Sequence, residues 1–134
     1  FVEFGEIALQ ADNVLNLPEG SYVALLSHSG SRGLGAAIAK HYSLLAREVC
    51  KLPREAQHFA RLSLDSEEGQ EYWMSMNLAG DYARACHERI HLNLAKALGL
   101  KPLANVNNHH NFAWKEEITP GRMAIVHRKG ATPA

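Results

Sequence analysis

Apolar residues recur every three or four positions over residues 67–98, which is the longest regular pattern in the chain. This spacing places them on one face of a helix, so we expect one long amphipathic α-helix there that ends at Gly99. Gly80 within it costs about 1 kcal/mol relative to alanine and indicates close packing or a slight bend. The apolar face consists of Tyr72, Met76, Ala79, Ala83, Cys86, Ile90, Leu94 and Leu98.

A shorter set of apolar positions has the same spacing and predicts another helix over about residues 33–51. Pro53 follows it and is typical of a chain that has just left a helix. Residues 53–66 show no strong period, so we expect a connection with one short turn. The apolar positions of this helix are Leu34, Ile38, Tyr42, Leu45 and Val49.

Alternation of apolar and polar residues over residues 1–8 predicts a strand. Residues 17–20 have the composition of a turn, and the apolar run over residues 22–27 then predicts a buried strand. A second turn, Thr119-Pro120-Gly121, leads into a predicted strand over residues 122–127. The fold class that we expect is therefore α+β, with two main helices packed on short strands.

The segment between the long helix and the second turn reads as extended and polar over residues 104–112. Phe1 is not a start residue and already lies within strand-like alternation, so we expect the chain to be part of a larger protein.

Composition narrows the possible functions. The 134 residues suit one domain, and 46% hydrophobic residues exclude a disordered chain. Fourteen Lys and Arg balance fourteen Asp and Glu, so a polyanion such as nucleic acid would need a local site. Apolar runs are far shorter than the ~20 residues of a membrane span, so we expect no membrane partner. With only Cys50 and Cys86, a reduced cytoplasmic setting is the expectation.

A polar, glycine-rich loop lies between the strand that ends at Ser27 and the first helix. Small residues over 29–35 let backbone amides approach a ligand, and a helix N-terminus and the Arg32 guanidinium both attract phosphate. An ordinary strand-to-helix turn with a solvated Arg32 explains the spacing equally well. His28 stands where the strand ends, a position from which side chains reach into sites, although a structural histidine is the commoner case there.

The string His87-Glu88-Arg89-Ile90-His91 matches the H-E-x-x-H pattern of zinc peptidases, which places two imidazoles on one helix face beside a carboxylate. No third ligand follows at the expected spacing, so Glu116 or Glu117 would have to supply it. Arg89 is also awkward within a helix that is buried behind its metal. We expect His87 and His91 to lie on a solvated flank of the helix.

The adjacent histidines His109 and His110 point to opposite sides of an extended chain, so one of them at most easily joins a given metal site. The neighbouring asparagines also fit a polar loop without function. His127, Arg128 and Lys129 end the last strand and fit either a phosphate contact or a solvated rim.

Taken together, several of these strings resemble the RtcB family of RNA ligases. The first is Leu26-Ser27-His28-Ser29-Gly30-Ser31-Arg32-Gly33, and the later ones are His109-His110-Asn111-Phe112 and His127-Arg128-Lys129-Gly130-Ala131. Phe1-Val2-Glu3 is similar to the residues that follow the family's Gly-Asn-His motif. One departure is Ala85-Cys86-His87, where the family usually has Ala-Asn-Arg, which leaves room for a divergent paralogue.

The resemblance implies that residues 1–134 are the central part of one catalytic domain, truncated at both ends and inactive alone. Such ligases join RNA ends bearing a 3′-phosphate or 2′,3′-cyclic phosphate to a 5′-hydroxyl, with GTP and manganese, through a guanylylated histidine. That nucleophile is expected beyond this chain.

The resemblance also implies roles for individual residues. His28 and His110 match metal-binding histidines, which we therefore expect to approach each other, and Arg32 matches an arginine that holds RNA phosphate. The positions that match guanylate contacts are Phe1, Val2, Glu3 and Asn111. The alternatives are a zinc metallopeptidase and a non-catalytic relative that binds nucleotide or RNA.

Overall fold

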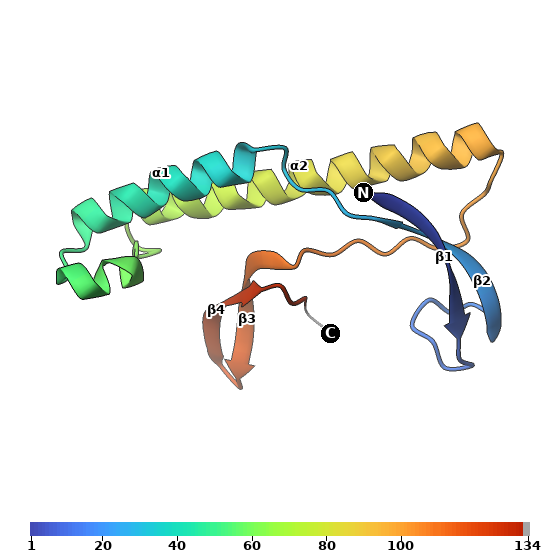
Figure 1. Cartoon of the computed structure of the whole chain (residues 1–134). Coiled ribbons are helices and arrows are strands. Elements are labelled where there is room, and N and C mark those ends of the chain that lie inside the picture. Colours follow the sequence, from blue (N-terminus) through green and yellow to red (C-terminus); the bar gives the residue numbers. More distant parts are fainter. Residues whose placement is uncertain (133–134) are drawn as a thin grey trace. The chain divides into compact units, whose positions relative to one another are not determined.

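The computed structural model describes residues 1–132 and has helices and short antiparallel strands, so the predicted α+β class is confirmed (Figure 1). Pro133 and Ala134, the last residues of the predicted domain, lie outside the described part. Contacts divide the chain into two compact units, Phe1–Ala104 and Asn105–Ala134.

The first unit contains a hairpin followed by helices. Strand β1 spans Val2–Leu9 and strand β2 spans Gly20–Ser27. Helix α1 spans Leu34–Val49, a short 3-10 helix spans Arg54–Phe59, and helix α2 spans Glu67–Leu98. Both predicted helices, the first strand and the short turn between the helices are therefore confirmed.

The two helices lie side by side because small residues let them approach closely (Figure 1). Ala79, Gly80 and Ala83 of α2 are buried, and a Cβ added at Gly35 of α1 would lie 4.0 Å from that of Ala79. Of the two explanations for Gly80, close packing or a bend, its burial supports close packing. Farther along, the rings of Tyr42 and Tyr72 have centroids 5.0 Å apart.

Both ends of α2 carry standard caps. The Ser66 hydroxyl accepts a hydrogen bond from the amide of Gly69 (3.2 Å) and donates one to the carbonyl of Ser63 (3.0 Å). Gly99 adopts a left-handed conformation (φ 64°), which glycine reaches at no steric cost. The predicted end of the helix at Gly99 is therefore confirmed.

The β1–β2 hairpin pairs Val2 with Ser27 and Leu9 with Gly20. Its long connection is held by the side chain of Asn13, whose amide nitrogen donates to the carbonyls of Gln10 and Leu17 at 2.7 Å each. The end of β2 contacts α2. This contact places Ser27 and the residues after it against the C-terminal half of the long helix.

The second unit is a hairpin of strand β3 (Asn111–Thr119) and strand β4 (Arg122–Lys129). The predicted turn at residues 119–121 is confirmed, with Gly121 at φ 76°. Most of β3 was missed, because its Lys115, Glu116 and Glu117 hide the alternation that predicts a strand.

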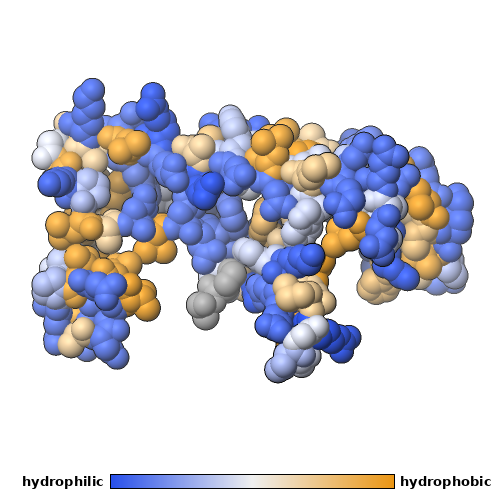
Figure 2. All heavy atoms as spheres, turned by 180° about the vertical axis from the view of Figure 1, so that it is seen from behind, coloured by the Kyte–Doolittle hydropathy of each residue, from blue (hydrophilic) through white to orange (hydrophobic). Residues whose placement is uncertain are grey.

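The predicted strand over residues 22–27 is confirmed as part of β2, but the prediction that this strand is buried is wrong. Val23 is 80% exposed and Leu26 is 54% exposed. Figure 2 shows hydrophobic side chains at the surface, interspersed with polar ones. The buried hydrophobic residues among those described are small apart from one leucine: Leu9, Ala46, Ala79, Ala83, Ala95 and Ala113. No helix in residues 1–132 is long and apolar enough to cross a membrane.

Candidate functional site

Pairing of β1 with β2 brings Phe1 next to His28. The backbone amide of His28 donates to the carbonyl of Phe1 at 2.9 Å, which extends the ladder one step beyond the strands. Their rings meet edge to face, with centroids 5.3 Å apart. Two residues singled out from different motifs, 27 positions apart in sequence, are therefore neighbours in this unit.

The two faces of the hairpin differ in what they contact. The Ser27 hydroxyl reaches α2, where it lies 2.7 Å from Nε2 of His91. Since side chains alternate along a strand, His28 and its neighbour Phe1 lie on the opposite face, and Glu3 follows Phe1 two residues on. Val2 pairs with Ser27 and so shares the face toward α2.

The two histidines of the H-E-x-x-H string bind the end of β2. Nε2 of His87 lies 2.9 Å from the amide nitrogen and 2.8 Å from the carbonyl oxygen of Ser29. Nε2 of His91 contacts Ser27 as above. Both residues are half-buried, so the prediction that they lie on a solvated flank is wrong. Their nitrogens bond β2 and the residue that follows His28.

The loop after His28 satisfies part of its own hydrogen bonding. Ser31 accepts from the amide of Leu34 through its carbonyl (3.1 Å) and from the amide of Gly35 through its hydroxyl (2.8 Å). An anion held here would therefore depend on Arg32 more than on these two amides. Arg32 is exposed and adopts a left-handed conformation (φ 55°), which is uncommon outside glycine.

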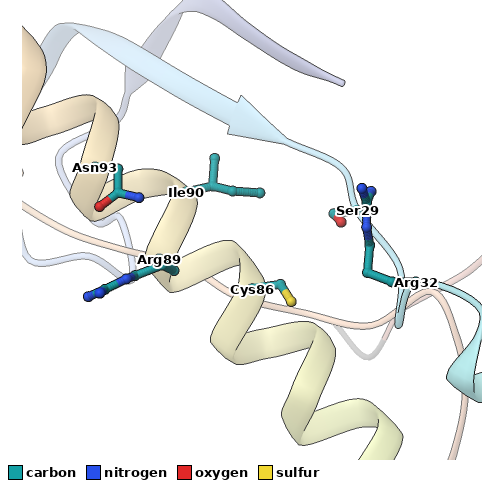
Figure 3. A pocket seen from close by; sticks show the side chains of 6 residues that line it. All are labelled: Ser29, Arg32, Cys86, Arg89, Ile90 and Asn93. Atoms are coloured by element: carbon teal, nitrogen blue, oxygen red, sulfur yellow. The ribbon is translucent and has the colours of Figure 1, made fainter.

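A shallow, open cavity of about 300 Å³ lies between this loop and α2. Figure 3 shows Cys86 and Ile90 pointing from the helix toward the loop that carries Ser29 and Arg32, whereas Arg89 extends away from that loop. Arg32 is thus the positively charged side chain on the loop side of the cavity. An apolar floor with a guanidinium at its rim suits a phosphate whose attached group rests on the floor.

In the second unit, Asn111 links two of the motifs. Its side-chain nitrogen lies 3.0 Å from Nδ1 of His110, and its side-chain oxygen accepts from the amide of Gly130 at 2.9 Å. The adjacent ring of His109 stacks on Phe112, with centroids 4.8 Å apart. The two neighbouring histidines therefore have different surroundings, as their opposite directions predict.

The cation cluster at the end of β4 is partly structural. Arg128 forms a two-pronged ion pair with Glu116 (2.5 and 2.8 Å) and lies over the ring of Trp114, 5.2 Å from its centroid. The hydrogen bond from Arg128 lowers the pKa of the Glu116 carboxyl, and the same bond raises the pKa of Arg128. Arg128 thus has a partner inside its own hairpin.

Each unit carries some of the predicted site residues. The first holds Phe1, Glu3 and His28 on one hairpin, and the second holds His110 with Asn111. Among residues 1–132, no group of three or more His, Cys, Asp or Glu is arranged to hold a metal ion. The approach of His28 to His110 stays a prediction, since the two residues belong to different units.

His87 and His91 are the residues of this site whose role the sequence did not reveal. A signal was present, because their spacing by four places both imidazoles on one face of α2. The partner was not readable, because it comes from a strand about 60 positions earlier in the chain.

Comparison with known proteins identifies the family. The family model described as tRNA-splicing ligase RtcB matches residues 1–134. A tRNA-splicing ligase RtcB of Methanocaldococcus jannaschii is 35% identical over 133 residues, which covers 87% of this chain and 14% of that protein. The one of Methanococcus maripaludis is 32% identical, covering 84% of this chain and 26% of the relative.

A eukaryotic relative agrees with the two archaeal ones. RNA-splicing ligase RtcB homolog 1 of Entamoeba dispar is 30% identical over 94% of this chain and 26% of its own length. The chain thus spans between about one seventh and one quarter of these three relatives. No solved structure matches it at a significant level. Because the family model matches the chain from end to end, the chain belongs to the RtcB family.

Proposed function

We propose that this chain is part of an RNA ligase that joins a 3′-phosphate or 2′,3′-cyclic phosphate end to a 5′-hydroxyl end. GTP and manganese are the proposed cofactors, and a guanylylated histidine outside this chain is the proposed nucleophile. The observation that carries the proposal is the family match over residues 1–134, which includes every motif named above in one continuous stretch.

Manganese is proposed to bind through His28 and His110. The donor chemistry fits, because neutral imidazoles bind divalent first-row metals and His28 is exposed at the end of a fixed strand. The described residues bring no third ligand to either histidine, so further ligands must come from elsewhere in the protein. A bound divalent ion neutralises phosphate charge and orients the reacting oxygens.

Guanylate is proposed to contact Phe1, Glu3 and Asn111, and Val2 beside them. Phe1 offers an aromatic ring next to His28, and Glu3 offers an acceptor on the same face of the hairpin. Val2 points to the other face, so its contribution would come from the main chain. Asn111 is held at both ends of its amide, which fixes the direction in which it meets a ligand.

Arg32 is proposed to hold an RNA phosphate at the cavity between its loop and α2. Its guanidinium stands on the loop side of that cavity, opposite Ile90 (Figure 3). A planar fork of donors matches phosphate oxygens and gives a charge-assisted bond.

The peptidase alternative is not favoured. The two histidines that it needs bind Ser27 and Ser29 through Nε2. Its candidate third ligands also have partners, since Glu116 pairs with Arg128 and Glu117 accepts from the amide of Gly121 at 2.6 Å. A zinc ion would have to displace these bonds before it could bind.

Ligation by the intact protein tests the proposal. Two RNAs, one with a 2′,3′-cyclic phosphate and one with a 5′-hydroxyl, are incubated with GTP and Mn²⁺, and the joined product is measured. We expect a product that His28→Ala abolishes and Glu88→Gln leaves unchanged. A folded protein that binds GTP or RNA and forms no product would instead identify a non-catalytic relative.

A further inference from the structure

We propose that His87 and His91 are positioning residues for His28. They hold the main chain on both sides of it and thereby set the direction of its imidazole. The inference rests on the proposed metal role of His28, but it concerns residues to which no role in that site has been assigned.

The contacts fall directly before and after His28. His91 bonds the hydroxyl of Ser27 at 2.7 Å, and His87 lies within hydrogen-bond distance of both main-chain polar atoms of Ser29. The main chain of His28 itself bonds Phe1, whose carbonyl accepts from the His28 amide and whose amino nitrogen donates to the His28 carbonyl, both at 2.9 Å. Residues 27–29 are therefore fixed at three successive positions.

The spacing of the two elements matches. Four residues along a helix rise about 6 Å. Two residues along a strand advance about 6.6 Å. An i,i+4 pair on α2 can therefore reach residues i and i+2 of an extended segment that runs alongside it. His87 and His91 meet this condition with Ser29 and Ser27 in antiparallel order.

The helix is a suitable support because its packing fixes it. Ala83 and Ala95, on either side of the histidine pair, are buried. The segment after His28, by contrast, contains Gly30 and Gly33 and leaves the strand ladder at once. Glycine loops lose the most conformational entropy on ordering, so external bonds are needed to hold them in one conformation.

The two bonds act from the face opposite the His28 side chain. Ser27 faces α2, whereas His28 packs against Phe1 on the other side of the hairpin. His87 and His91 can therefore orient His28 without occupying the space that a ligand of His28 would use. The two residues that orient His28 therefore lie on a different face of the hairpin from the proposed metal site.

The test uses the intact protein with Mn²⁺ as the probe, in the absence of GTP and RNA. Free Mn²⁺ is followed by electron paramagnetic resonance during titration, so the readout is independent of ligation. The variants are His87→Ala, His91→Ala and Ser27→Ala, and His28→Ala serves as the reference for loss of the ligand itself. Glu88→Ala is the matched control, since it lies between the histidines and is exposed.

We expect His87→Ala and His91→Ala each to raise the Mn²⁺ dissociation constant about 10-fold, the lower end of the range for groups that orient metal ligands. Ser27→Ala removes the same hydrogen bond as His91→Ala without altering α2. A variant that combines the two substitutions should therefore raise the Mn²⁺ dissociation constant no further than either one alone. His87→Gln keeps a donor and an acceptor and should restore most of the affinity. Glu88→Ala should change the Mn²⁺ dissociation constant by less than about two-fold.

Other outcomes separate this inference from the proposed function. If His28→Ala weakens Mn²⁺ binding but His87→Ala and Ser27→Ala do not, the positioning role is wrong and the metal role of His28 stands. If His28→Ala itself has no effect, both fail. If His87→Ala does not fold, the strand-side variant Ser27→Ala and the conservative His87→Gln decide the matter, because unchanged affinity in Ser27→Ala overturns the inference.

Discussion

A single nitrogen of His87 stands 2.9 Å from the amide nitrogen of Ser29 and 2.8 Å from its carbonyl oxygen. One imidazole nitrogen either accepts from the amide or donates to the carbonyl, depending on its proton. The first choice holds the peptide group before Ser29 and the second holds the peptide group after it, so both act on the same residue. Ser29, two residues beyond the end of β2, is therefore held against α2 whichever tautomer His87 adopts.

Replacement of Arg32 should weaken RNA handling without unfolding the protein. Arg32→Ala removes a charge-assisted phosphate contact, worth about 1.5–3 kcal/mol, so we expect KM for RNA to rise about 10- to 100-fold. Arg89→Ala is the matched control, because Arg89 lines the same cavity but extends away from the loop (Figure 3). Equal effects of the two variants on KM, or no effect of Arg32→Ala, would show that the loop is structural.

His28 and His110 should bind one ion. In a crystal structure of the intact protein with Mn²⁺, both imidazoles should coordinate it, with metal–nitrogen distances of about 2 Å, as in other histidine sites. Imidazoles more than about 12 Å apart with no shared cleft would refute the shared site, since such bonds are so short.

Glu88 should not be a catalytic base. Glu88→Gln is expected to leave ligation unchanged, and His91→Ala should not release tightly bound zinc, because zinc held by two imidazoles alone is incompletely coordinated. Peptide cleavage lost in Glu88→Gln, or stoichiometric zinc lost in His91→Ala, would favour the peptidase instead. Zinc content is measured by mass spectrometry and cleavage with a casein substrate.

Gly69 should be intolerant of any side chain. A Cβ there would lie 1.8 Å from the carbonyl oxygen of Ser63, a backbone atom that cannot move aside cheaply. Gly69→Ala is therefore expected to destabilise the protein by about 1–3 kcal/mol or more, as overpacking does. The comparison is Glu71→Ala, an exposed position on the same helix, which should change stability by less than about 0.5 kcal/mol. Urea unfolding of the intact protein measures both, and equal midpoints would contradict the prediction.

Stability of the β3–β4 hairpin should depend on acid pH through Glu116. Its bond to Arg128 lowers the pKa of the carboxyl, so the folded hairpin holds the proton less tightly than the unfolded chain. The resulting stabilisation is present above the ordinary value of 4.5 and is lost as the pH falls below it, through the lowered pKa.

Hydrogen exchange of the β3–β4 amides in the intact protein, followed from about pH 7 down to about pH 3 and corrected for intrinsic rates, measures this dependence. Glu116→Gln should lower protection at neutral pH and flatten the profile. A profile that Glu116→Gln leaves unchanged would show that the ion pair does not stabilise the hairpin. The Glu88→Gln variant, with its change on α2, should keep the original profile.

The sequence by itself determined both helices and their ends, because an apolar repeat of 3.6 residues, Pro53 and Gly99 act locally. It also determined the family, because the motif around His28 is specific enough to be recognised and the family model confirms it. It failed on most of β3, where Lys115 and two glutamates interrupt the apolar alternation.

Only the tertiary structure decided what His87 and His91 do. Their spacing is a local property that fits a zinc site, a solvated helix flank or a pair of positioning residues equally well. Nothing near them in sequence distinguishes these three roles. The distinction comes from the end of β2, which chain folding carries to the same face of α2. Hydrogen-bond partners that lie some 60 residues apart are determined by the packing of the strand and the helix, and the local periodicity of the sequence does not predict that packing.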